Sequence, residues 1–174
     1  MKGRSNSMAA LVAMVLIVVA ASPTPVGAQW STVDSVNEYG EVTGKAAASQ
    51  WTAPARPLAA PYEDVMARVV VNDFGVHLEF TVPPNLVGGQ KNDGYDIHHL
   101  RGRWDGVPVS SFMVDQRWGD TSLHFYADKK KVKRILRHET LSVAMDWYGA
   151  GPAAWNFSLA GASEALAEAA GPKR

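Results

Sequence analysis

The sequence predicts a β-rich α+β domain, an antiparallel β meander or sandwich with one inserted basic helix and a short C-terminal helix. Three observations predict this class. Several short runs rich in β-branched and aromatic residues alternate apolar with polar side chains, which is the period of a strand with one buried face. Turn-forming dipeptides separate these runs. Two segments change instead to helical spacing or helix-forming composition.

The chain begins with the three-part pattern of a secretory signal peptide. Lys2 and Arg4 precede the uncharged run MAALVAMVLIVVAA over 8–21, which is shorter than the roughly 20 residues of a membrane-spanning helix. Val26, Gly27 and Ala28 then offer modest side chains at the positions that signal peptidase inspects. We therefore predict a signal peptide over 1–28 and cleavage after Ala28. The protein would be periplasmic, with secretion as the second choice, and would have no stable membrane anchor.

Residues 29–61 are expected to form a flexible N-terminal arm with one strand near Trp30 to Val36, because Ala, Pro and Ser dominate and periodicity is weak. Residues 62–174 are expected to form a single globular domain. The whole chain has 17 basic and 17 acidic residues and no cysteine. This balance does not favour nucleic acid as a partner. A domain of this length can be held together by packing alone.

Two hairpins are predicted after Pro61. MARVVV over 66–71 and VHLEFTV over 76–82 form the first, because Val76, Leu78 and Phe80 alternate with polar residues. The second joins YDIHHLRGRW to VPVSSFMV through Asp105-Gly106, a dipeptide that tolerates the positive φ angles of a tight turn. The alternation slips at Ser110-Ser111, which predicts a bulge. TSLHFY over 121–126 is a further short strand.

The period then changes in DKKKVKRILRH over 128–138, where Val132, Ile135 and Leu136 have helical spacing and Asp128 is placed to cap the start. Six cations crowd this helix. One interpretation is a solvated face. The other is a binding patch for an acidic partner, a lipid phosphate or a cell-wall polymer; its residues are Lys129, Lys130, Lys131, Lys133, Arg134 and Arg137.

A third hairpin and a short helix complete the predicted domain. LSVAMDW over 141–147 and AAWNFSL over 153–159 restore the strand pattern, which places Trp147, Trp155 and Phe157 in the core. GASEALAEAAG is rich in helix formers between two glycines.

Residues from about 101 to 170 carry a recurring set of features: RGRWDGVPV, then LHFY, then VKRILRHETLSV and the ending WNFSLAGASEAL. With these features the chain resembles the periplasmic, type VI secretion-associated TagO/VasI family, whose F-x-L-x-G-x-x-x-A motif the ending matches. The family's usual cysteine pair is absent here. The resemblance implies an envelope location and a non-enzymatic role, with no catalytic residues to carry over.

No catalytic, cofactor or metal site is predicted. Ser163 lies at a strand–helix junction, but Ala165 stands where the G-x-S-x-G nucleophile elbow requires glycine. Adjacent His98 and His99 would point to opposite faces of a strand. Asp96 and His98 would share a face, and with His77 or His124 a metal site is conceivable; polar residues on the wet side of a sheet explain them better.

Two functions remain open after this exclusion. The first is a non-catalytic exported envelope protein that acts by contact with an unknown envelope protein, as an accessory of a secretion system. The alternative is a glycan or cell-wall binding module that uses the basic helix and exposed aromatic residues. Four tryptophans are candidates for such exposure: Trp30, Trp51, Trp104 and Trp118.

Overall fold

The computed structural model describes residues 30–36, 39–72, 75–126 and 128–171. This part of the chain contains ten strands and two helices. In chain order they are β1 (Trp30–Val36), β2 (Val42–Ser49), β3 (Ala67–Asn72), β4 (Gly75–Phe80), β5 (Gln90–Asn92), β6 (Tyr95–Trp104), β7 (Val107–Arg117), β8 (Ser122–Phe125), α1 (Asp128–Ile135), β9 (Thr140–Trp147), β10 (Gly151–Ser158) and α2 (Ala162–Ala169). The predicted signal peptide over 1–28 lies outside the described residues.

All ten strands belong to one sheet, in the order β1-β2-β3-β4-β8-β7-β6-β9-β10, with β5 paired to β6. Every strand pair is antiparallel. The β-rich α+β class predicted from the sequence is therefore confirmed. The prediction left a meander and a two-sheet sandwich open, and the hydrogen bonds connect the described strands into a single sheet.

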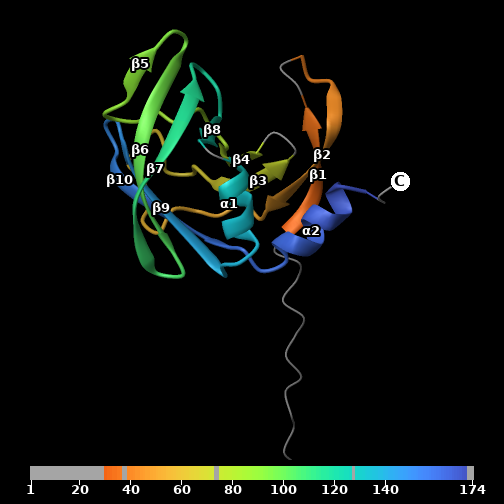
Figure 1. Ribbon diagram of the computed structural model, residues 1–174. Coiled ribbons are helices and arrows are strands. Elements are labelled where there is room, and N and C mark those ends of the chain that lie inside the picture. The colour runs from red at the N-terminus through yellow and green to blue at the C-terminus, as the bar shows by residue number, and fades with distance from the viewer. Residues whose placement is uncertain (1–29, 37–38, 73–74, 127, 172–174) are drawn as a thin grey trace, which may run out of the picture.

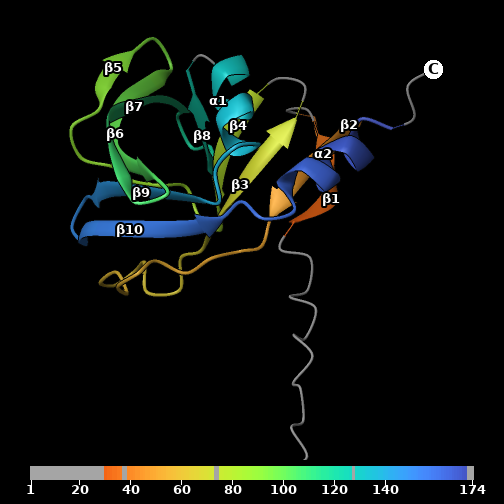
Figure 2. The same cartoon turned by 60° about the horizontal axis from the view of Figure 1, so that its bottom comes forward.

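The sheet curls around one large apolar core, and Figures 1 and 2 show the curled sheet from two directions. The segment after β2 connects strands that are distant in the sheet order. Thr52 pairs with Ala67 at the start of β3, and the Ala55 N–H donates to the Ala154 carbonyl of β10 at 2.7 Å. This segment therefore covers the edge that β10 would otherwise leave open.

Alternation along β9 and β10 places their large side chains inside. Leu141, Val143, Met145 and Trp147 are buried on β9. Trp155 and Phe157 are buried on β10 and lie directly opposite Val143 and Leu141. The predicted core positions of Trp147, Trp155 and Phe157 are therefore confirmed.

The N-terminal segment differs from the flexible arm expected for residues 29–61. Its first strand, β1, lies where the sequence predicts it, but a second strand, β2, pairs with both β1 and β3. Trp30 is buried, and its indole Nε1–H donates to the Ser158 carbonyl at 3.0 Å. The sequence of β2, VTGKAAAS, did not suggest a strand because alanine has a low strand propensity. Burial of Ala46, Ala47 and Ala48 overrides that preference.

The β6–β7 hairpin has the predicted turn and bulge. Trp104 pairs with Val107, and Asp105 and Gly106 between them have φ angles of 48° and 78°. Leu100 pairs with Phe112 but Gly102 pairs with Val109, so two steps along β6 match three along β7. The extra residue falls in the stretch that contains Ser110-Ser111, as predicted.

The two helices pack on different parts of the sheet. In α1, Ile135 is buried in the core and Val132 packs against it, and the helix lies beside β4 (Figure 1). In α2, Ala162 and Ala165 enter the core, and the helix lies against β1 and β2. Neither helix is long and apolar enough to cross a membrane, and the described residues contain no other helix.

Candidate functional site

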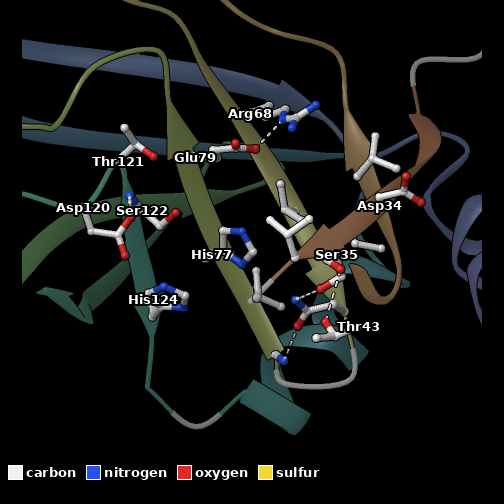
Figure 3. A pocket seen from close by; sticks show the side chains of 17 residues that line it. Asp34, Ser35, Thr43, Arg68, His77, Glu79, Asp120, Thr121, Ser122 and His124 are labelled. Atoms are coloured by element: carbon white, nitrogen blue, oxygen red, sulfur yellow. Dashed lines mark hydrogen bonds and ion pairs between the residues drawn. The ribbon is translucent and has the colours of Figure 1, made fainter. Parts of the chain in front are cut away.

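A groove of about 560 Å³ lies on the outer face of the sheet, opposite the core (Figure 3). The β1–β2 hairpin forms one wall, β3 and β4 form the floor, and β8 with its preceding loop forms the other wall. The side chains that Figure 3 labels along the groove are Asp34, Ser35, Thr43, Arg68, His77, Glu79, Asp120, Thr121, Ser122 and His124.

Strand alternation explains why polar residues line this groove. On β3 and β4 the core takes Val69, Val71 and Leu78, so Arg68, His77 and Glu79 point to the outer face. The groove also has a small apolar part. Outward-facing Val70 forms a second buried cluster with Ala46 and Ala48, against which Val33 packs. The groove therefore combines an apolar patch with polar walls.

Opposite charges are paired within the groove. The Arg68 Nε–H donates to Glu79 Oε2 at 2.6 Å across β3 and β4. The guanidinium of Arg68 also lies 4.5 Å from the ring centroid of Trp51, which holds it in a cation–π contact. On the β1–β2 wall, Asp34 Oδ1 accepts a hydrogen bond at 2.5 Å from Nζ of Lys45, which lies outside the groove lining. Among the described residues that line the groove, the acidic side chains are Asp34, Glu79 and Asp120 and the basic one is Arg68, so the lining is more acidic than basic.

Two histidines meet across β4 and β8. His77 and His124 are direct register partners, and their ring centroids are 4.9 Å apart. Burial is the largest of three causes that together lower the pKa of His77 to about 3; the neighbouring His124 and Arg68 are the other two. His77 is therefore a neutral imidazole at physiological pH, able to donate one hydrogen bond and to accept another.

Two hydroxyl-bearing residues of the groove, Ser35 and Thr43, form hydrogen bonds with partners other than its histidines. In the described part of the groove, no hydroxyl group is hydrogen-bonded to an imidazole. The Ser35 hydroxyl accepts from Asn72 Nδ2 at 3.5 Å, and Thr43 Oγ1 donates to the Ser35 carbonyl at 3.1 Å. Within the same described ranges, no group of three or more His, Asp or Glu side chains is placed to hold a metal ion. The paired nucleophile and base that covalent catalysis requires is not assembled there.

The structure does not bring together the residues considered for a metal site, which were Asp96, His98 and either His77 or His124. His77 and His124 lie on the outer face, whereas His98 is buried, and its Nε2 has no hydrogen-bond partner. Burial lowers the pKa of His98, and the neighbouring Asp96 opposes this shift. The structure instead places His77 next to His124, a pairing that the sequence did not predict.

Ser163 lies in the first turn of α2, as predicted. Its hydroxyl donates to Glu164 Oε2 at 2.8 Å. The helix begins after Gly161, which has a φ of 88°. Glycine favours that left-handed conformation.

The predicted binding patch on α1 is separate from the groove. Lys130, Arg134 and Arg137 are exposed. Lys131 Nζ donates to the Tyr126 carbonyl and lies 5.1 Å from the Phe125 ring centroid. None of these four side chains lines the groove. The side chains of Lys129 and Lys133 lie outside the described residues.

The tryptophans divide differently from the expected set of four. Trp30 and Trp104 are buried, at 4% and 5% exposure, whereas Trp51 and Trp118 are 38% and 60% exposed.

A second hollow shares Asp120 and His124 with the groove and adds Tyr95 and Tyr126. Sequence periodicity did not indicate this hollow, because β6, β7 and β8 contribute its residues separately.

The chain was compared with protein families, curated proteins and solved structures. No family model matches the chain, no curated protein matches it, and no solved structure matches it.

Proposed function

We propose that the protein is a non-catalytic, exported binding protein of the bacterial cell envelope, and that the outer-face groove binds a segment of a partner protein. The groove itself is the observation on which this proposal depends. Its paired charges, neutral His77 and apolar patch match a polypeptide, which presents amide groups and apolar side chains alternately.

The cellular context comes from the sequence. The signal-peptide pattern over 1–28 supports a periplasmic location, with secretion as the second choice. The resemblance of residues 101–170 to the TagO/VasI family supports a role as an accessory of a secretion system. No catalytic role is assigned to any residue under this proposal.

A photoreactive amino acid placed at Thr121, on the groove wall, tests the proposal in intact cells. We expect a discrete adduct with one envelope protein. The same probe at Glu168, on an exposed part of α2, should give no such adduct. Thr43→Arg should abolish the adduct because Thr43 is an exposed groove residue. Glu168→Arg, with its added basic side chain away from the groove, should leave the adduct unchanged. Equal adducts from both probe positions, or none from either, would contradict the proposal.

A glycan or cell-wall ligand is the second candidate. Exposed Trp118, and separately the hollow lined by Tyr95 and Tyr126, favour it, because aromatic rings with polar neighbours can stack on sugar rings. Purified peptidoglycan sacculi should then sediment the protein. Tyr126→Ala should reduce the sedimented fraction, whereas Tyr148→Ala should not, since Tyr148 is an exposed tyrosine outside this hollow. No sedimentation of the wild-type protein would exclude this candidate.

A further inference from the structure

A third hollow, of about 620 Å³, lies on the outer face where β6, β9 and β10 are neighbours. The hollow exists because the outward positions of β9 and β10 on its floor carry small or medium-sized side chains. Ser142 pairs with Asn156, and Ala144 pairs with Ala154, across these two strands. Larger residues at these four positions would fill the space.

Three arginines surround this floor. Arg101 and Arg103 lie on the outward face of β6, directly opposite Ala144 and Ser142 of β9. Arg56 approaches from the other side, because the Ala55 N–H is hydrogen-bonded to the Ala154 carbonyl of β10. Figure 2 shows the segment after β2 running beneath β10. Positive charge therefore borders the hollow from both sides.

This positive charge is only partly neutralised. Among the described residues that line the hollow, none is acidic. Arg101 Nη2 donates to Asp146 Oδ1 at 3.0 Å, at an exposed site. Arg56 and Arg103 have no carboxylate partner in the described part of the chain. Arginines without a carboxylate that share one hollow indicate an anionic ligand.

We infer that this hollow binds a phosphate group attached to an apolar body. A carboxylate offers two oxygens to one guanidinium, whereas a phosphate offers enough oxygens to engage Arg56 and Arg103 from opposite sides. The remaining lining contributes apolar surface for the rest of the ligand, from Pro108, Val109, Ala144, Pro152 and Ala154. The volume lies in the usual range of small-molecule sites, about 300–1,000 Å³. This site is separate from the groove of the proposed function.

The phosphate could belong to a soluble ester or to a lipid headgroup, and two probes distinguish them. Phenyl phosphate is titrated into the protein by calorimetry. Vesicles of phosphatidylcholine alone, and of equal parts phosphatidylcholine and phosphatidylglycerol, are tested by co-sedimentation. Saturable binding of phenyl phosphate supports a soluble ester, and binding only to the vesicles with phosphatidylglycerol supports a headgroup. Inorganic phosphate should bind more weakly than phenyl phosphate, because it has no apolar body.

Arg56→Ala and Arg103→Ala should each weaken binding about tenfold or more, as expected for loss of a charged hydrogen bond. Lys91→Ala on β5 removes one positive charge from an exposed site outside the hollow and should change binding less than twofold. Thermal melting of each variant confirms that it is folded. The inference is overturned if neither phenyl phosphate nor phosphatidylglycerol binds, or if inorganic phosphate binds equally well. An equal loss with Lys91→Ala would also overturn it.

Discussion

A Cβ atom added to Gly102 would lie 1.9 Å from Cε2 of Phe112. The Phe112 ring cannot easily move aside, because it is buried between Trp104 and Phe125, with centroid distances of 5.7 and 5.4 Å. The absence of a side chain at position 102 therefore permits this aromatic contact next to the β7 bulge.

We expect Gly102→Ala to lower the free energy of unfolding by about 1–3 kcal/mol, which is typical of an overpacked core. Gly44→Ala is the matched control, since it also lies on a strand but has no atom within 4 Å of the added Cβ. Urea denaturation of both variants measures the difference. Equal stability of the two variants would show that the core near Phe112 can adjust.

At the scale of the element, β10 tests the assignment of inward and outward faces. Phe157→Ala removes a buried ring and should cost about 3–5 kcal/mol. Asn156→Ala and Ser158→Ala lie on the outward face and should change stability by about 0.5 kcal/mol or less. Thermal melts of the three variants provide the comparison. A larger loss in Asn156→Ala than in Phe157→Ala would mean that the strand register is shifted by one residue.

The β1–β2 hairpin gives a second prediction at this scale. Because Trp30 and the alanines of β2 are buried, limited proteolysis should leave a resistant fragment that still includes β1 and β2. Mass spectrometry of the fragment locates its first residue. A wild-type fragment that begins near Tyr62 would instead support the flexible arm predicted from the sequence.

Trp30→Phe removes the hydrogen bond to the Ser158 carbonyl and should lower the free energy of unfolding by about 1 kcal/mol.

For the whole molecule, histidine burial makes stability depend on pH. The folded pKa of His77 is about 3, against 6.5 for the free side chain. The unfolded chain therefore binds a proton that the folded chain excludes, so stability falls as the pH drops below 6.5. The lowered pKa of buried His98 acts in the same direction.

We expect the melting temperature of the wild-type protein to fall between about pH 7 and 5, over which an unfolded histidine becomes charged. His77→Asn should show a smaller fall. His99→Asn changes an exposed histidine and should follow the wild-type curve. Parallel curves for the wild-type protein and His77→Asn would contradict a half-buried, neutral His77.

Much of the fold could be predicted because its signals are local. β-rich composition identified β3, and composition together with alternation identified β4 and the strands from β6 to β10. Asp105-Gly106 and Ser110-Ser111 indicated a turn and a bulge at the correct places. The three-residue β5 was not among the predicted strands. The alanine-rich β2 was missed because its side chains carry little strand propensity, and their burial depends on the neighbouring strands.

The candidate sites could not be predicted, because each depends on which strands become neighbours. His77 and His124 meet only because β4 pairs with β8. Arg56 and Arg103 border one hollow only because β6 pairs with β9, β9 with β10, and Ala55 with Ala154. The sequence by itself determined which face of most strands is apolar, since side-chain alternation is a property of a single strand. Only the tertiary structure decided which polar side chains share a surface, because strand order depends on contacts between residues far apart in the chain.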